Sequence, residues 1–336
     1  MELTRTTIKD VSDAAGVSIK TVSRVLNKEK YVSDDTRLRV EAAVAKLNYH
    51  PSLAARTLAG KRSFQIGLIY DNPSPYYIFN MQAGVRTRCL EAGFRMIVQP
   101  CDVNSPTLLD DIASLIDQSH LDGVILTPPV GDVPEALAAL ERRGIPFVRV
   151  QPGADPAATS STFIDNVQAA DDMTAHLIGL GHRRIGFVAG HPNYAVSSQR
   201  LCGYRQALER AGLAFDTALV IEGRFDFQSG SEAAETLLAL PTPPSAIFAS
   251  SDDMAAGVLA TAHRLGISVP QSLSVAGFDD TDLARFVWPP LTTIRQPTFD
   301  LGYAAAGLLL EFEEGVEAKQ LPHDLIIRAS TAPPSL

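Results

Sequence analysis

Short apolar segments alternate with amphipathic helical segments along most of this 336-residue chain, and this alternation restricts its fold more than any other feature. Strands that alternate with helices form parallel sheets covered by helices on both faces. The alternation runs through once and then recurs, which predicts an α/β body of two similar, doubly wound lobes. The expected strands are residues 64–70, 94–100, 123–127 and 147–150, followed by 184–189, 219–222, 246–250 and 273–277.

Composition excludes several classes of protein. Hydrophobic residues make up 46% and charged residues 20%, the balance of a globular chain with a sizeable core. Cys89, Cys101 and Cys202 form no Cys-x-x-Cys pair, so neither a disulfide scaffold nor a structural zinc site is expected. No apolar run reaches the roughly 18 residues of a membrane span, and no signal-peptide core follows Met1. We therefore expect a cytoplasmic protein with no membrane partner, no metal and no other cofactor.

Charge is divided unevenly along the chain. Residues 1–63 contain 12 Lys and Arg against 7 Asp and Glu, whereas residues 64–336 contain 17 against 31. A basic segment joined to an acidic body predicts that the first segment alone meets a polyanion. Chance, with an ordinary solvated face, is the alternative explanation of the charge division.

Residues 7–47 predict three short helices arranged as a helix-turn-helix. Thr7 and Asp10 have the spacing of a capping box, and Gly16 is placed to end the first helix. After Ser18, a second helix carries an apolar stripe made of Val22, Val25 and Leu26, and its opposite face carries Ile19, Lys20, Ser23, Arg24 and Asn27. A third helix from Ser33 is expected to bury Val40, Val44 and Leu47. Such a unit places its second helix in the DNA major groove. A small helical bundle with a polar face is the alternative.

This segment resembles the head of the lactose-repressor (LacI/GalR) family of regulators. The resemblance rests on TIKDVSDAAGVS at 7–18, KTVSRVLN at 20–27, LNYHP at 47–51 and LAGK at 58–61, and it continues through the body to GFDD at 277–280. It implies a transcription regulator, expected to be a repressor, that binds a near-palindromic double-stranded operator as a homodimer. Two-fold proteins read two-fold sites.

The resemblance also implies roles for individual residues of the head. Ile19, Lys20 and Arg24 are the expected base readers, and an arginine such as Arg24 can donate two hydrogen bonds to guanine. Lys20 is expected on guanine or on a phosphate. The residues expected to position the head on phosphates are Thr7, Ser18, Thr21, Ser23, Asn27, Ser33 and Thr36.

Residues 52–59 favour helix in composition but span only eight positions. Isolated helices shorter than about 12–15 residues are marginal in water, so we expect this segment to fold only beside its dimer mate on DNA. The resemblance implies a hinge helix that contacts DNA through Ala55 and Leu58, with Leu58 wedged into the minor groove. A simple flexible linker is the alternative.

An effector pocket is expected where polar and aromatic residues follow the strands of the body. The resemblance assigns it to Tyr76, Tyr77, Asp165, Arg200, Phe225, Ser251 and Asp279. An aspartate and an arginine together grip a diol, and an aromatic ring covers the apolar face of a sugar, so a small sugar-like effector is predicted. The alternatives are a structural ion pair between Arg200 and Asp279, and ordinary core packing of the aromatic residues. Ser74 and Ser251 both replace an asparagine common in the family, which leaves the identity of the sugar open.

The implied domains are a head at 1–47, a hinge and linker at 48–63, a first lobe at 64–162 plus 292–322, and a second lobe at 163–291 plus 323–336. A carbohydrate-acting enzyme or a sugar-binding receptor on the same two-lobed fold is the alternative function. An enzyme is not expected, because no phosphate-binding loop, nucleophile elbow or His-Glu-x-x-His motif occurs. A receptor has no use for residues 1–50.

Overall fold

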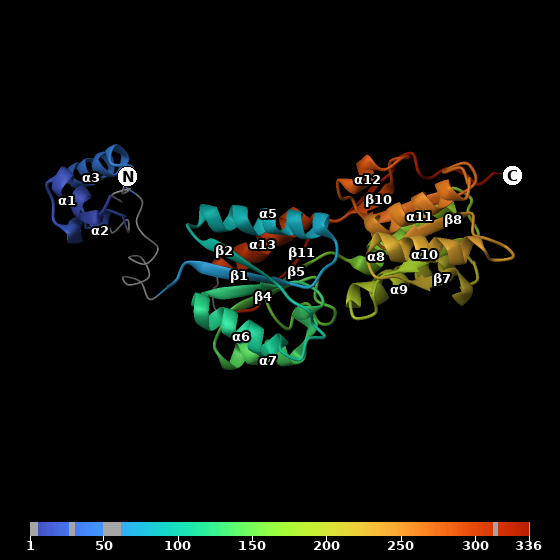
Figure 1. Cartoon of the computed structure of the whole chain (residues 1–336), viewed down its shortest axis with the longest axis horizontal. Helices are drawn as coiled ribbons and strands as arrows, with labels where there is room; N and C mark the ends of the chain where they lie inside the picture. The colour runs from blue at the N-terminus through green and yellow to red at the C-terminus, as the bar shows by residue number, and fades with distance from the viewer. Residues whose placement is uncertain (1–5, 27–30, 50–61, 312–314, 336) are drawn as a thin grey trace. The chain divides into compact units, whose positions relative to one another are not determined.

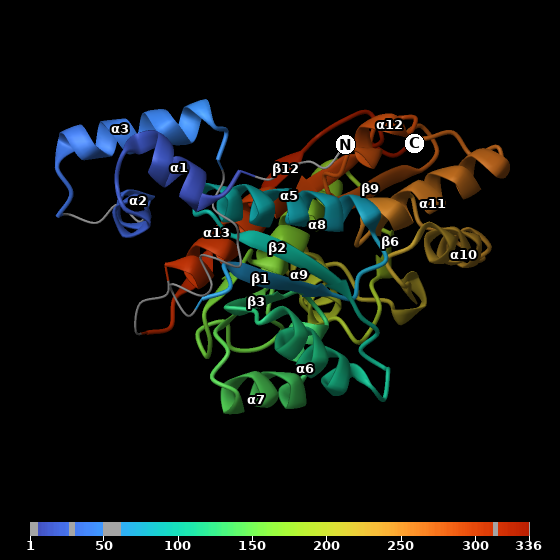
Figure 2. The same ribbon diagram turned by 60° about the vertical axis from the view of Figure 1, so that its left-hand side comes forward.

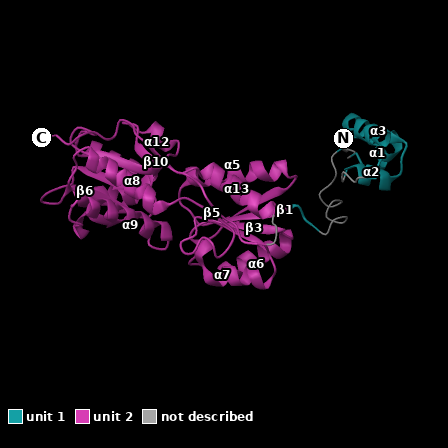
Figure 3. Ribbon diagram, turned by 180° about the vertical axis from the view of Figure 1, so that it is seen from behind, with its two compact units in different colours: residues 1–64 teal, residues 65–336 magenta. Residues whose placement is uncertain are grey.

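The computed structural model describes residues 6–26, 31–49, 62–311 and 315–335. These residues divide into two compact units, residues 1–64 and residues 65–336 (Figure 3). The expected DNA contacts Asn27, Ala55 and Leu58 lie outside the described residues. In the described segments, no helix combines the length and hydrophobicity needed to cross a bilayer.

The first unit contains three helices among its described residues, and local capping explains where they begin and end. They are α1 (Ile8–Ala15), α2 (Ile19–Leu26) and α3 (Asp34–Lys46). Thr7 and Asp10 form the predicted capping box, and Gly16 ends α1 in the left-handed conformation at φ 64°. The Ser18 hydroxyl accepts from the Thr21 amide at 3.1 Å, and Ser33 caps α3. The predicted helix-turn-helix is therefore confirmed in its elements.

Apolar residues from all three helices form a separate core in this unit. Val11, Val22, Val25 and Val40 are buried in it, together with Tyr49 beyond the end of α3. Half-buried side chains that pack against this core are Ile8, Val17, Leu26, Val32, Val44 and Leu47. The expected apolar stripe of the second helix thus faces inward, which leaves its other face for contacts outside the unit.

The second unit holds two sheets, and the first of them is parallel throughout. Its strand order is β11-β5-β4-β3-β1-β2. Helices α5 (Pro75–Glu91) and α13 (Thr298–Leu310) pack together on one face, with α6 (Leu108–Ser119) and α7 (Pro134–Arg142) on the other (Figure 1). The strands are β1 (Gln65–Tyr70), β2 (Arg95–Pro100), β3 (Gly123–Leu126), β4 (Phe147–Val150), β5 (Ser161–Phe163) and β11 (Ala318–Gln320).

The second sheet has the order β12-β10-β9-β8-β6-β7, with β12 alone antiparallel to its neighbour. Helix α8 (Asn166–Gly179) packs on α9 (Ala195–Arg210), and α10 (Phe227–Leu238) lies beside α11 (Asp252–Arg264) (Figure 2). Short elements η1 (Val130–Asp132), η2 (Thr217–Leu219) and α12 (Leu283–Phe286) complete the unit. The strands are β6 (Ile185–Ala189), β7 (Val220–Glu222), β8 (Ala246–Ala249), β9 (Ser274–Asp279), β10 (Thr292–Arg295) and β12 (Asp324–Ile326).

The two sheets confirm the predicted fold class, but they correct one predicted boundary. Residues from 292 onward were expected in the first lobe, whereas β10 pairs with β9 and belongs to the second sheet. The chain passes to the first lobe only after Arg295. Strands β5, β10, β11 and β12 were not predicted, because their three or four residues include polar side chains such as Thr292, Thr293 and Lys319 and form no apolar run.

Candidate functional site

A cavity that we call the inner pocket lies between the carboxyl ends of the two sheets. In each sheet the strand order reverses, between β1 and β3 and between β6 and β8, and these are the switch points where such folds bind ligands. The first lobe contributes Tyr77 on α5 and, from its loops, Asn72, Ser74, Pro128 and Gln151. The second lobe and the segment after β10 contribute Tyr194, Val196, Arg200, Phe225, Ser251, Asp279 and Gln296.

Arg200 projects from α9 and is held rigidly although it is charged and buried. Its Nε donates to Oδ1 of Asn166 at 3.0 Å, and its Nη1 donates to the carbonyl of Ser250 at 2.6 Å. The guanidinium lies 3.6 Å from the ring centroid of Phe278 and 6.0 Å from that of Phe225. These contacts orient a cation toward the pocket with a fixed donor geometry, as recognition of hydroxyl groups requires.

Asp279 ends β9 with its carboxyl group in the pocket and a backbone φ of 115°, which is strained for a residue other than glycine. Burial raises the pKa of this carboxyl to about 7, opposed by Arg200 and by a hydrogen bond that Gln296 donates. Arg200 and Asp279 both belong to the second lobe, and among the described residues they bond to other partners: Arg200 donates to Asn166 and the Ser250 carbonyl, and Asp279 accepts from Gln296. The alternative of a structural ion pair across the cleft is therefore not supported.

We expect Asp279→Asn to stabilise the ligand-free protein at alkaline pH. The folded chain holds a proton that the unfolded chain releases near pH 4, so the stabilising contribution of this carboxyl is lost as pH rises toward 7. The free energy of unfolding of the variant should exceed that of the wild type by about 4 kcal/mol at pH 8 and by little at pH 3. Urea denaturation at the two pH values measures the difference. Equal differences at both would contradict it, and the exposed Asp110→Asn serves as the control.

Aromatic residues form the apolar walls of the pocket. Phe225 adopts a positive φ of 61°, and its ring meets that of Tyr194 edge to face with centroids 5.1 Å apart. Both rings are also part of the second lobe's hydrophobic core, so packing and pocket lining are combined in the same residues. Tyr77 is buried on α5, and burial, followed by the negative charge of Asp279, raises the pKa of its hydroxyl group, which keeps it neutral.

Buried amide side chains connect the pocket to the segments that join the lobes. Oε1 of Gln151, at the end of β4, accepts hydrogen bonds from the Ile164 amide and from Nδ2 of Asn166, each at 3.2 Å. Asn166 in turn receives the hydrogen bond of Arg200. Ile164 lies on the segment between β5 and α8, so Arg200 is linked through two amides to a connection between the lobes.

The same chain of hydrogen bonds reaches a second connection. Nε2 of Gln151 donates to Oε1 of Gln296 at 2.8 Å, and Gln296 donates to Asp279. Gln296 lies on the segment between β10 and α13, where the chain crosses from the second lobe to the first. We call Asn166, Gln151 and Gln296 the amide relay. The amide relay joins the two polar groups of the pocket, Arg200 and Asp279, through two of the segments that cross between the lobes, the one after β5 and the one after β10.

Three hydrogen bonds close the lobes over the pocket at separate points. They are Ser74 Oγ to Asp253 Oδ2 at 2.8 Å, Tyr194 Oη to the Asp71 carbonyl at 2.5 Å, and Gln199 Nε2 to the Gly153 carbonyl at 3.1 Å. Each pairs a residue of a first-lobe loop with one of the second lobe, so opening the cleft breaks all of them.

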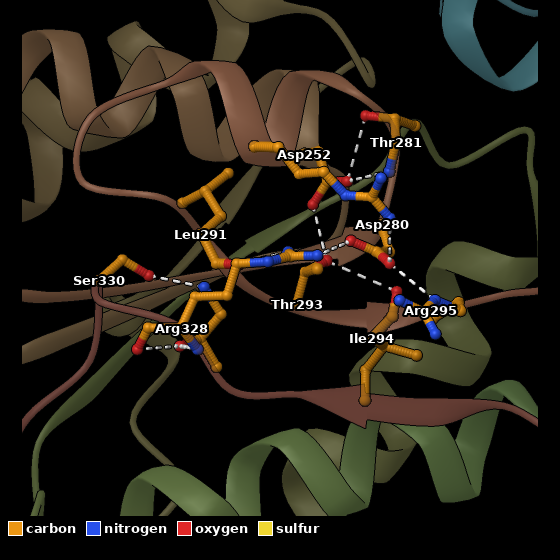
Figure 4. Close-up of polar contacts among 11 residues, drawn as sticks. Asp252, Asp280, Thr281, Leu291, Thr293, Ile294, Arg295, Arg328 and Ser330 are labelled. Carbon is orange, nitrogen blue, oxygen red and sulfur yellow. Dashed lines mark hydrogen bonds and ion pairs between the residues drawn. The ribbon is translucent and has the colours of Figure 1, made fainter.

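Two carboxylates beside the pocket, those of Asp252 and Asp280, make hydrogen bonds and ion pairs with neighbouring strands and loops (Figure 4). Asp280 is buried and forms ion pairs with Arg295, at 2.7 Å, and with Arg328. Asp252 is buried and accepts from the Thr281 amide at 2.8 Å and from the Thr293 hydroxyl at 2.7 Å. These contacts give both carboxylates structural roles, and the described residues contain no metal-binding cluster.

The structure brings together five of the seven predicted pocket residues: Tyr77, Arg200, Phe225, Ser251 and Asp279. Tyr76 is half-buried but is not among the lining residues, because its helical neighbour Tyr77 takes the inward position on α5. Asp165 is exposed and its side chain caps α8 by accepting from the Gln168 amide.

Sequence reasoning missed Gln151, Tyr194 and Gln296. Gln151 directly follows a predicted strand, and ligands of such folds bind beyond the carboxyl ends of the strands, so the sequence was sufficient to find it. Tyr194 lies on the loop after β6, which the same rule also indicates. Gln296 follows β10, a strand that the sequence did not reveal.

The described residues of the head present the predicted face on α2. Ile19, Lys20 and Arg24 are exposed, whereas Val22 and Val25 are buried beneath them. Ile19 retains 47% of its accessible area, an unusual exposure for a large apolar side chain. Of the residues expected on phosphates, Thr7, Ser18 and Ser33 are exposed caps, and Thr21, Ser23 and Thr36 are half-buried.

Comparisons with known proteins agree with this architecture. Residues 7–52 match the model of the bacterial regulatory proteins of the lacI family, and residues 174–331 match a periplasmic binding protein-like domain. The HTH-type transcriptional regulator DegA of Bacillus subtilis (strain 168) is 35% identical over 98% of this chain and 99% of its own length. The structure of a CelR–cellobiose complex superposes with a TM-score of 0.74, at 32% identity over 97% of this chain and all of that one. The lac repressor dimer bound to operator and an anti-inducer gives a TM-score of 0.80, at 29% identity over 98% and 99% of the two chains. On this evidence of sequence and fold, the chain belongs to the lacI family of bacterial regulatory proteins.

Proposed function

We propose that this protein represses transcription by binding a near-palindromic operator as a homodimer, and that an uncharged sugar in the inner pocket sets its affinity for the operator. One observation carries the proposal: a helix-turn-helix with an exposed α2 face is joined to a two-lobed body whose pocket combines Arg200, Asp279 and aromatic walls. The relatives support it, since one was solved with cellobiose and another as a dimer on its operator.

Each of the expected domains is assigned one part of the proposed function. Residues 1–47 bind operator DNA, residues 48–63 join head to body, and the two lobes bind the effector, with the boundary at 292 moved beyond Arg295. Large exposed apolar side chains on the body, Phe79, Phe286 and Trp288, supply area for the homodimer interface. A protein that acts on chromosomal DNA in this way works in the cytoplasm and needs no catalytic centre.

Coupling between sugar and operator is proposed to run through the amide relay. A sugar hydroxyl that binds Arg200 or Asp279 competes with the hydrogen bonds that these groups make to Asn166 and Gln296. The amide relay includes residues at two of the segments that connect the lobes. A change of hydrogen bonding at the pocket therefore alters the position of one lobe relative to the other. A coupling free energy of about 1–3 kcal/mol changes operator affinity roughly 5–150-fold.

The proposal as a whole is tested with two probes. Duplexes selected by the protein from a random DNA library should share a two-fold symmetric sequence, and a thermal-shift screen of neutral sugars should identify a ligand. Adding that sugar should change the affinity for the selected duplex in a fluorescence anisotropy titration. A sugar that binds without changing operator affinity would contradict the proposed control.

Lys20→Gln is expected to alter which operator sequence is preferred. Lys20 is exposed at the start of α2, where it reaches a base edge if α2 enters the major groove. Selection from a random library with wild type and variant should show a changed base at one position of each half-site, with discrimination altered about tenfold. Lys9→Gln, on the exposed side of α1, is the control. A uniform loss of affinity over all sequences would reassign Lys20 to a phosphate.

A further inference from the structure

A second cavity, which we call the outer chamber, opens beside the inner pocket between the same two lobes. Its first-lobe wall includes Asp71, Asp102 and Asn104, after β1 and β2, and its second-lobe wall includes His191 and Tyr194, after β6. The chamber measures about 290 Å³ and the inner pocket about 30 Å³. Since a buried water needs roughly 10–15 Å³, the inner pocket must widen to admit one ring, whereas the outer chamber already has the room of a ligand site.

The two cavities are neighbours with a common wall. Asn72 and Tyr194 line both of them. The Tyr194 ring meets Phe225 of the inner pocket edge to face, and it meets His191 of the outer chamber at a centroid distance of 6.1 Å. A ligand with one ring in each cavity would therefore contact the Tyr194 side chain with both of its rings.

Polar atoms in the outer chamber are available to a ligand. Oδ1 of Asp102 accepts from the Asn104 amide at 2.9 Å, and Nδ1 of His191 accepts from the Asn193 amide at 3.1 Å. Oδ2 of Asp102, Nε2 of His191 and Nδ2 of Asn104 have no hydrogen-bond partner among the described residues. An acceptor, a ring nitrogen and a donor arranged around one cavity match the hydroxyl groups of a sugar ring.

Charge restricts what the chamber binds. Asp71 and Asp102 contribute two carboxylates to it. Arg224 also lines it, but its guanidinium lies 3.1 Å from Glu232 and 3.5 Å from Asp226. The local charge is therefore negative, which disfavours a phosphate or a carboxylate.

We infer that the outer chamber is a second subsite of the effector site and takes an uncharged, polyhydroxylated ring. The effector is then a two-ring molecule such as a neutral disaccharide, with one ring in the inner pocket and the other in the outer chamber. This inference rests on the proposed function of the inner pocket, and it adds the size and charge class of the ligand.

Isothermal titration calorimetry on the full chain tests the subsite. The probes are the common pentoses and hexoses, each beside neutral disaccharides that contain it and beside its phosphate esters. We expect one disaccharide to bind at least tenfold more tightly than its own monosaccharides, and its phosphorylated form to bind more weakly. Equal affinity for monosaccharide and disaccharide, or preference for a phosphate ester, overturns the subsite while the proposed function stands. Failure of every sugar to bind overturns the proposed function as well.

Variants locate the second ring. Asp102→Asn keeps Oδ1, the acceptor for the Asn104 amide, and replaces Oδ2 by an amide nitrogen. Asn104→Asp removes the Nδ2 donor and keeps Oδ1, which accepts from Asn193 of the second lobe at 3.5 Å. Both should weaken the disaccharide about tenfold and leave the monosaccharide within about twofold. Asp110→Asn, an exposed loss of the same charge on α6, should change neither. Equal loss for both ligands means that the variants act on lobe closure, and it overturns the assignment.

Discussion

Gly153→Ala is expected to weaken sugar binding at least tenfold and to abolish the effect of the sugar on operator affinity. Gly153 lies between β4 and β5, and a Cβ atom there would stand 2.2 Å from Cβ of Ala195 and 3.0 Å from Oδ2 of Asp132. Ala195 begins α9 of the second lobe, so the added methyl group separates the lobes instead of disturbing one core. Calorimetry with the sugar measures the affinity, and small-angle scattering of the body detects the opening.

A control and a rescue make this prediction specific. Gly179→Ala adds a methyl group at the end of α8 with nothing within 4 Å, so it should bind sugar normally. Ala195→Gly in the Gly153→Ala background removes the atom in conflict and should restore most of the affinity. Normal sugar binding by the single variant would show that this contact has no part in closure. A lack of rescue would place the effect in the backbone of residues 151–160.

Arg200→Lys is expected to lower sugar affinity about a hundredfold and to lower the free energy of unfolding by about 3 kcal/mol. The loss of stability is expected because Arg200 makes two buried charge-assisted hydrogen bonds, which contribute roughly 1.5–3 kcal/mol each. A lysine cannot donate to Asn166 and to the Ser250 carbonyl in the same geometry, and it cannot stack flat on Phe278. Operator binding without sugar should persist, because the head has its own core.

Arg205→Lys on the same helix is the matched control for Arg200. Arg205 is exposed, pairs with Glu209 one turn away and lies 5.4 Å from the ring centroid of Phe215, so its replacement by another cation should change stability by less than about 0.5 kcal/mol. Chemical denaturation and operator titrations with and without sugar compare the two variants. A normal sugar response from Arg200→Lys would move the effector to another site.

How far the sequence predicts the fold depends on how local the signals are. Thr7, Gly16 and Ser33 act within one helical turn, and the structure places them where capping chemistry predicts. The longer buried strands were also found within a residue or two, since four to six apolar residues suffice to mark them. β10 is as long as β3, β4 and β8, but its sequence, with Thr292, Thr293 and Arg295, contains no apolar run, so its structure depends on pairing with β9.

The prediction of pocket residues was also limited by how local the signals in the sequence are. Arg200 and Asp279 stand in motifs that are recognisable one by one. Gln151 and Gln296 are 145 positions apart, and only the packing of two lobes brings their amides to 2.8 Å. The Tyr76 prediction failed for a related reason: adjacent aromatic residues on a helix point in directions about 100° apart, and sequence alone does not say which of them faces inward.

Strand β12 and the residues after it have a consequence for biosynthesis. β12 pairs with β10, Arg328 binds Asp280, and Ser330 exchanges hydrogen bonds with the backbone of β9. The second sheet is thus completed by a strand that begins about 280 residues after the end of α3, so the head has all three of its helices long before the second lobe has all of its strands. A nascent chain released just before Asp324 would carry a folded head on an unfinished sugar sensor. Under the proposed function, a chain truncated before Asp324 is expected to keep the folded head and to lose its response to sugar.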